Sequence, residues 1–426
     1  MAGQAQRTTA EAEQGPGSPP PVPLRRNLRF QALWAGQAAA TLGMRVGDTA
    51  YPLLVLALTG SSTAAGAFGA LQMTATLLLG VHGGAVADRL DRRKVLIAAD
   101  AARLLASASV PAAMALHRLT LAHLLVVAVV VGATIAYSGP LRMLALRSVV
   151  APEQLPQALA QDEARMSGAA LAGPPLAGFL FGLGRSVPFL GAALASLLAL
   201  TAAVAVRFPG RPERAAEQQP GGALAGFRLI AASPLLRPAL GVLLMINLAG
   251  AALVLPVMVL LKDHGTTSGG IGLALAGEAL GALAGTLLVS RLHRLAGPGV
   301  LLLVTAWAAV PVTLAPLLPG GAATVFAALF VAGVGIPALR VMLDLLVFQQ
   351  VPDELRGRVI AATMTLLTAG MPAGTLGSGL LLDHLSPAAV LTAIAALLAA
   401  ALLPSTVGRT LRRAAWPTAQ TSADRL

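Results

Sequence analysis

The sequence predicts an all-α membrane protein with about twelve transmembrane helices. Of its 426 residues, 56% are hydrophobic and only 11% are charged, and the mean hydropathy is +0.77. A water-soluble core cannot hide so much apolar surface, so a bilayer must cover it. Apolar stretches of about 20 residues recur between short polar breaks, and each is long enough to cross the hydrocarbon as a helix. Few aromatic residues, with many Gly and Pro, favour packed helices over a β-barrel.

The expected spans follow one another with short connections. They lie at 30–58, 65–87, 95–116, 120–146, 160–184, 188–207, 236–261, 269–290, 298–318, 321–347, 358–382 and 386–407. Residues 1–28 are expected to form a disordered cytoplasmic tail, because they are rich in Gln, Glu, Pro, Gly and Ser and lack the pattern of a signal peptide.

A polar, Pro- and Gly-rich segment divides the spans into two groups of six. We therefore expect an N-terminal six-helix bundle at 29–207, a cytoplasmic linker with a short amphipathic helix at 208–234, a C-terminal six-helix bundle at 235–408, and a cytoplasmic tail at 409–426.

The positions of the basic residues predict the orientation. The formal net charge is +12, and if both termini are cytoplasmic, the predicted outer loops hold only Arg118, Arg185 and Lys262, while Arg45 lies inside a span. The remaining Lys and Arg residues lie on or near the inner side, which is the positive-inside pattern. The sequence therefore predicts a multi-pass protein of the inner (plasma) membrane, with the lipid bilayer and not nucleic acid as its partner. Zero cysteines exclude disulfides and thiol chemistry.

Two internal similarities relate the halves. Ala151 to Leu155 reads Ala-Pro-Glu-Gln-Leu, and Val351 to Leu355 reads Val-Pro-Asp-Glu-Leu, at an offset of 200 residues. Arg89-Leu90 has a weaker counterpart in Arg291-Leu292, at an offset of 202. The matching offsets indicate two pseudo-symmetric halves, an arrangement found in transporters with a substrate site near the midplane.

A compact basic turn, Gly84 to Lys94, is expected between the second and third spans. With Leu33 to Gln37, Gly139 to Arg142 and Val351 to Val359, this turn resembles the major facilitator superfamily, and in particular its twelve-span drug:proton antiporters of the macrolide-efflux and siderophore-exporter branch. The loop pattern Gly-x-x-x-Asp-Arg-x-Gly-Arg-Arg/Lys of that superfamily falls on Gly84, Asp88, Arg89, Arg92 and Arg93, with Asp91 in place of the second Gly.

The resemblance implies the major facilitator fold and assigns two sets of residues. The first set is a cytoplasmic gate that stabilises an outward-open state, and the alternative is an ordinary positive-inside loop. Its members are Gly84, Asp88, Arg89, Arg92, Arg93, Asp100, Arg103 and Arg142, the last three expected near inner helix ends. The second set resembles an antiporter signature associated with exporters, although ordinary small-residue packing explains its glycines equally well. Its members are Gly168, Gly173, Pro174 and Gly178.

Ionisable groups inside spans are the candidates for proton coupling, because an unpaired charge at mid-bilayer costs about 2.5–3.5 kcal/mol. Asp48 follows Arg45 at i+3. Asp48 is therefore expected to form a local ion pair with Arg45, to bind and release the coupled proton, or to do both. Glu278 has no basic residue adjacent in its own span, which suits a proton carrier, and the alternative is a hydrogen bond to another helix or a water-filled cavity. The substrate-cavity candidates are Gln37, Arg45, Tyr51, Tyr137 and Asn247, since helices one, four, seven and ten face the cavity in the resembled fold. Hydrogen bonding of helices explains Gln37, Tyr51 and Asn247 at least equally well.

Several classes of function have no support. The histidines lack the spacing of metal ligands, no phosphate-binding loop of an ATPase occurs, and no catalytic motif suggests an enzyme. We expect no cofactor and no metal, with the proton motive force as the energy source. The expected function is proton-coupled efflux of hydrophobic or amphipathic small molecules by a monomer through alternating access. The alternatives are a proton-coupled importer of a nutrient or siderophore and a transport-inactive receptor on the same fold.

Overall fold

The computed structural model describes residues 22–206, 225–295, 297–351, 353–408 and 411, without the side chains of 81–89, 292, 344–350 and 353–354. All regular elements of this part of the chain are helices. They are α2 (Leu28–Thr59), α3 (Ser62–Arg89), α4 (Arg92–Ala115), α5 (Leu121–Ser148), η1 (Pro152–Gln154), α6 (Leu155–Leu183), α7 (Val187–Ala205), α8 (Ala225–Ala232), α9 (Leu236–Asp263), α10 (Ser268–Leu295), α11 (Pro298–Leu314), η2 (Ala315–Leu317), α12 (Ala322–Gln350), α13 (Asp353–Leu382) and α14 (Pro387–Val407).

Eleven described helices are long and apolar enough to cross a membrane. The long helix α2 is not among them, although its 32 residues would reach about 48 Å. Its apolar stretch is interrupted by polar side chains, including Arg45 and Asp48. With α2, the helices match the twelve expected spans to within five residues at each end. The fold class is therefore the predicted one, an all-α membrane protein.

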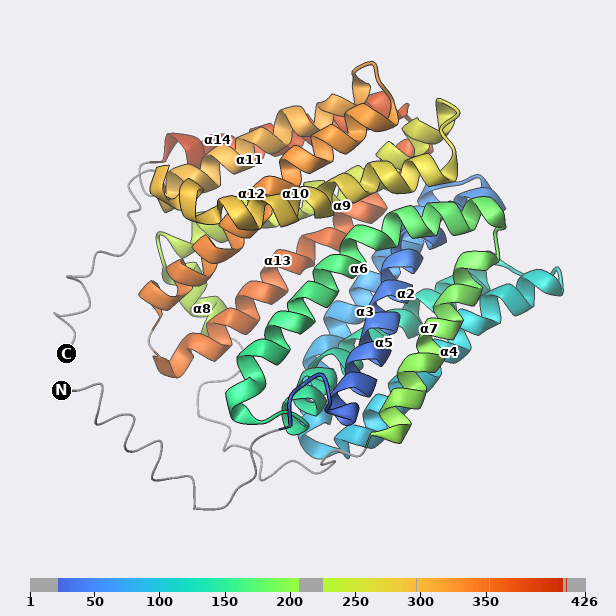
Figure 1. The fold of residues 1–426 in the computed structure, drawn as a ribbon. Coiled ribbons are helices and arrows are strands. Elements are labelled where there is room, and N and C mark those ends of the chain that lie inside the picture. The colour runs from blue at the N-terminus through green and yellow to red at the C-terminus, as the bar shows by residue number, and fades with distance from the viewer. Residues whose placement is uncertain (1–21, 207–224, 296, 352, 409–410, 412–426) are drawn as a thin grey trace, which may run out of the picture.

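The helices gather into two groups, one from each part of the chain (Figure 1). In the first group, α2 packs against α6 and α7, α3 against α5, and α4 against α5 and α7. In the second, α9 packs against α13 and α14, α10 against α12, and α11 against α14. The short helix α8 lies in the segment where an amphipathic helix is expected, and it packs against α13.

Two helix pairs make most of the contacts between the groups, α3 with α13 and α6 with α10. Glycines make both contacts close. A Cβ at Gly66 of α3 would lie 2.7 Å from the Thr375 carbonyl oxygen and 3.1 Å from Gly379 Cα of α13. On the other pair, Gly178 of α6 lies against Gly269 of α10. These glycines are near the start of α3 and α10 and near the end of α6 and α13. In the predicted orientation this is the outer end of the molecule, and we use that name for it.

The basic turn is shorter than expected. Helix α3 continues through Arg89, so Gly84 to Arg89 are helical, and only Leu90 and Asp91 separate it from α4. Asp91 stands where the family pattern has Gly, and its side chain accepts hydrogen bonds from the backbone N–H groups of Arg93 and Lys94, at 3.0 and 3.1 Å. A carboxylate at this position caps the N-terminus of α4, which makes a sharp turn possible without glycine.

Candidate functional site

The acid–base pair predicted on α2 is formed and solvent-accessible. Arg45 and Asp48 lie one turn apart, with 3.5 Å between the guanidinium and carboxylate and 46% of each side chain exposed. Asp48 is about 16 Å from the outer end of α2. An exposed charged pair this far inside a membrane helix indicates that the side chains face a hydrated space rather than lipid.

Glu278 lies at the same depth on a helix of the other group. It is about 15 Å from the outer end of α10, and its side chain is exposed. Although α10 offers it no adjacent basic residue, the charge of Arg45 acts on the Glu278 carboxylate from across the interface between the groups. Arg45 thus pairs directly with Asp48 and attracts Glu278 at longer range. The sequence alone did not indicate the attraction to Glu278.

The small residues of α6 allow this approach. Gly173 lies against the backbone and Cβ of Arg45, and the neighbouring Pro174 carbonyl lies against Gly272 of α10. A larger side chain on α6 would hold α2 and α10 apart. Gly178 packs on the start of α10, whereas Gly168 is exposed and contacts nothing that a Cβ would displace. Three of the four antiporter-like positions thus lie at contacts between helices.

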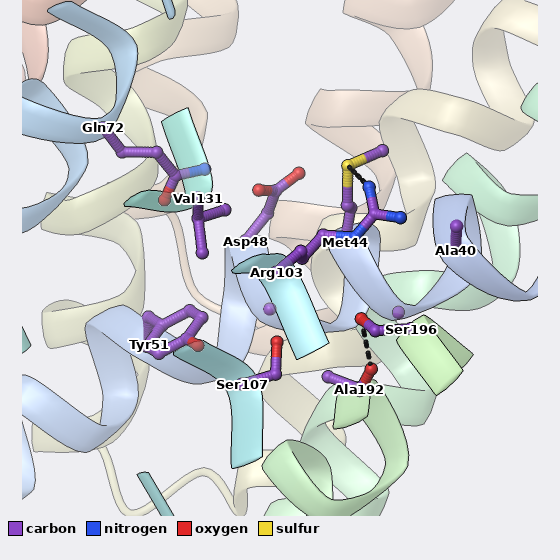
Figure 2. A pocket seen from close by; sticks show the side chains of 12 residues that line it. Ala40, Met44, Asp48, Tyr51, Gln72, Arg103, Ser107, Val131, Ala192 and Ser196 are labelled. Carbon is purple, nitrogen blue, oxygen red and sulfur yellow. Dashed lines mark hydrogen bonds between the residues drawn. The ribbon is translucent and has the colours of Figure 1, made fainter. Parts of the chain in front are cut away.

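Behind Asp48 a small cavity, lined by both polar and apolar residues, lies within the first helix group. Figure 2 shows Asp48, Tyr51, Gln72, Arg103 and Ser107 around it. Its volume of about 20 Å³ is enough for one water molecule. Arg103 Nε is buried there without a hydrogen-bond partner among the described residues. Such groups need a partner when they are buried, and a water in this cavity would supply it.

The Tyr51 ring itself belongs to the core. It stacks on Phe68 with centroids 4.6 Å apart and lies 4.8 Å from Phe189. Tyr51 was predicted to line the substrate cavity, and in the structure it lines the small cavity behind Asp48.

Asp100, Arg103 and Arg142 form a buried cluster deeper than expected. Arg103 donates to Asp100 at 2.7 Å, Arg142 donates to the same carboxylate oxygen, and Asp100 is 2% exposed. The three groups lie about 9–16 Å from the ends of α4 and α5, not near the inner helix ends as predicted. All three come from one helix group, so in this conformation the cluster joins α4 to α5. The formal charges of these three side chains sum to +1.

Another ion pair, Asp162 with Arg165, lies within α6, and its arginine also links α6 to α2. Arg165 donates to Asp162 at 2.6 Å and to the Gln37 carbonyl oxygen at 3.0 Å, and it also contacts the Thr41 hydroxyl. Gln37, a predicted cavity residue, is buried, and its Oε1 has no hydrogen-bond partner among the described residues.

Other predicted positions are less central. Tyr137 is half-buried on α5, and the Asn247 amide donates to the Leu243 carbonyl of its own helix at 2.9 Å. Arg93 donates to the Val204 carbonyl near the end of α7 at 2.6 Å, so it stabilises a helix end within its own group. Arg92 is half-buried. The side chains of Gly84, Asp88 and Arg89 lie outside the described residues.

Three contributors were missed from the sequence. Gln72 and Ser107 line the cavity behind Asp48, and their only signal was a polar residue within an apolar span. Asp383 binds the start of α3, and its signal was an acidic residue directly after a span. Among the described residues, no three metal-ligating side chains gather.

Comparison with known proteins gives the fold and a family. A family model described as a transmembrane secretion effector matches residues 19–420. A bacterial homologue of the iron transporter ferroportin in an inward-facing state is similar, with a TM-score of 0.65, 18% identity, and 89% of this chain and 99% of that one covered. A search of curated proteins found no match.

Two further solved structures are similar at the same level. The nucleoside transporter NupG has a TM-score of 0.67 and 14% identity, with 89% of this chain and 98% of that one covered. A bacterial homologue of the human lysosomal transporter Spinster, inward-facing and unoccupied, has a TM-score of 0.67 and 16% identity, with 95% and 100% covered. At these identities the likeness concerns the fold.

Proposed function

Because the chain belongs to the transmembrane secretion effector family of major facilitator transporters, we propose that it exports a hydrophobic or amphipathic small molecule in exchange for protons. The chain is a membrane transporter of this type. The direction, the cargo and the proton coupling are the proposal.

The observation that carries the proposal is the set of charges shared between the helix groups. Asp48 and Glu278 lie at the same depth, both are exposed, and Arg45 interacts with both. One guanidinium cannot neutralise two carboxylates, so the set has a formal charge of −1 when both are ionised. A proton or a cationic cargo group would neutralise that charge, and the two therefore compete for it.

Arg45 gives the competition a physical basis. In this conformation it pairs with Asp48 at 3.5 Å. Protonation of Asp48 would weaken that pair and leave Arg45 available to Glu278, which belongs to the other helix group. A proton on one carboxylate thereby changes the attraction between the two groups, which is what coupling to alternating access requires.

The closed outer end supports loading from the inner side. The helix groups meet at the outer ends of α3 with α13 and of α6 with α10, and we infer that the shared charges are reached from the other end. In the predicted orientation that is the cytoplasm, where cargo for export is taken up. The secretion description of the family agrees with this direction.

Efflux assays in cells test the proposal. A lipophilic cationic dye and a panel of macrolides would be loaded into cells that express wild type, Asp48→Asn, Glu278→Gln or the control Glu153→Gln, whose carboxylate is exposed on η1 outside the shared set. We expect wild-type cells to show efflux that a protonophore abolishes. At least one of Asp48→Asn and Glu278→Gln should lose this efflux, and Glu153→Gln should retain it. Efflux indifferent to both substitutions and to the protonophore would refute proton coupling, and uptake instead of efflux would reverse the direction.

A further inference from the structure

Asp383, at the end of α13, binds the N-terminus of α3 across the two helix groups. Its two carboxylate oxygens accept from the Ser62 N–H at 2.7 Å, the Ser61 hydroxyl at 2.8 Å and the Thr63 N–H at 3.2 Å. The first turn of a helix has N–H groups without partners inside the helix. In α3 the first two of these are satisfied by a residue that is about 320 positions away in the sequence.

The rest of that helix start is arranged around this contact. The Ser61 hydroxyl accepts from the Ala64 N–H at 3.2 Å, so it caps the third N–H of α3 while it donates to Asp383. The Thr63 hydroxyl lies 3.4 Å from the Gly379 carbonyl oxygen. A carboxylate at a helix N-terminus also interacts favourably with the helix dipole.

The contact between Asp383 and the start of α3 can form only while α3 and α13 are packed together at the outer end. Gly66 and Gly379 let the backbones of α3 and α13 meet one turn further in, since a Cβ on either would lie 3.1 Å from the Cα of the other. Thr375, another turn along α13, lies against Gly69 and donates toward the Met73 sulfur at 3.8 Å. If these helices separate at their outer ends, Asp383 loses all three hydrogen bonds together.

We propose that Asp383 is the latch of the outer gate: its carboxylate caps α3 only while the helix groups are closed at the outer end, and so favours the inward-open conformation. The Asp383 side chain is exposed already in the closed conformation, so opening outward replaces its hydrogen bonds to the two backbone N–H groups with hydrogen bonds to water. The latch acts whatever cargo or ion the transporter carries, so it does not depend on the proposed exchange of cargo for protons.

The latch has a definite expected strength. Loss of a capping side chain changes the free energy of a helix by an amount that corresponds to a factor of about five in an equilibrium constant. Here the equilibrium is that between the inward-open and outward-open conformations. Replacing Asp383 with Ala should therefore raise the outward-open fraction about fivefold. Asp383→Asn retains one acceptor oxygen of the two, so it should fall between wild type and Asp383→Ala.

A labelling rate measures that fraction even when it is small. The natural chain has no cysteine, so Thr375→Cys provides one thiol between α3 and α13. In intact cells, a membrane-impermeant maleimide reaches this thiol only when the outer end opens. We expect the labelling rate to rise in the order wild type, Asp383→Asn, Asp383→Ala, with about a fivefold span.

Two controls separate latch release from general loosening. Asp263→Ala removes an exposed carboxylate at the same end and should leave the Thr375→Cys rate unchanged. A second reporter, Ser196→Cys, is buried within the first helix group and should react equally slowly with and without Asp383. Equal Thr375→Cys rates in all three Asp383 backgrounds, or equal increases at both reporters, would overturn the proposal.

Discussion

The buried cluster of Asp100, Arg103 and Arg142 should be a main source of stability in the first helix group. Asp100 is 2% exposed and is the carboxylate that both arginines contact. Asp100→Asn removes that charge and leaves two buried guanidinium groups without it. Breaking one buried ion pair by removing a partner costs about 3–5 kcal/mol, so the free energy of unfolding should fall by at least about 3 kcal/mol.

Asp48→Asn is the matched control for this prediction. It is the same chemical change in the same helix group, but its ion pair with Arg45 has 46% of each side chain exposed. A solvent-exposed pair contributes less than about 1 kcal/mol. Unfolding by SDS in mixed micelles, followed by tryptophan fluorescence, would measure both variants.

A double variant tests the cause. Adding Arg142→Gln to Asp100→Asn removes one of the two unpaired guanidinium groups, so the double variant should lose less than the sum of the two single losses. Equal losses for Asp100→Asn and Asp48→Asn, or a strictly additive double variant, would refute the reasoning from burial and charge.

Three further predictions concern helix ends and the outer gate. Gly66→Val should hold α3 away from Thr375 and Gly379 and raise the outward-open fraction, seen as faster labelling of an outer-gate thiol; an unchanged rate would contradict the packing argument. Asp91→Ala should lower stability by about 1 kcal/mol through loss of the α4 cap, whereas Asp91→Ser should retain most of it, so equal losses in SDS unfolding would exclude the capping role. Desolvation tends to raise the pKa of Asp383, but hydrogen bonds from Thr63, Ser61 and Ser62 outweigh it and hold this pKa below its ordinary value. The stabilisation of the closed outer gate by the Asp383 carboxylate is therefore fully present above about pH 4. It is lost as the pH falls through the lowered pKa. The labelling rate should thus stay constant from pH 8 to pH 5 after correction for maleimide reactivity, and a midpoint near pH 6.5, where an ordinary histidine titrates, would contradict this.

The fold was largely predictable because its determinants are local. Each span is a run of apolar residues long enough to cross a bilayer, and the short polar breaks between spans leave few alternatives for the chain. The basic turn was the main local error. Its glycine-based pattern predicted a loop from Gly84 to Lys94, but Asp91 supplies a helix cap, and α3 and α4 continue almost to it from both sides.

The site was only partly predictable because its contacts are not local. The i+3 spacing of Arg45 and Asp48 predicts their pairing within one helix. Nothing in the spacing indicates that Arg45 also acts on Glu278, since their separation depends on how α2 and α10 each pack against the small residues of α6. The Asp383 contact joins residues in different halves of the chain, so it too depends on tertiary structure.

The predicted gate was affected by the same limit. Asp100, Arg103 and Arg142 were grouped by sequence with the loop residues of the resembled family, as a gate near the inner helix ends. In the structure they lie deeper and contact one another within one helix group. The position of a residue along its predicted helix does not show whether its partner lies in the same helix group or in the other one.

We propose that carboxylates of the two helix groups bind the protons that the transporter exchanges for cargo. The most direct measurement reconstitutes the protein in proteoliposomes and records cargo flux and proton flux together, for wild type, Asp48→Asn, Glu278→Gln and the exposed control Asp263→Asn. We predict that cargo moving one way drives protons the other way in wild type and in the control, and that at least one of Asp48→Asn and Glu278→Gln loses the proton flux. Cargo flux that carries no protons in wild type, or proton coupling that persists in both carboxylate variants, would contradict the account.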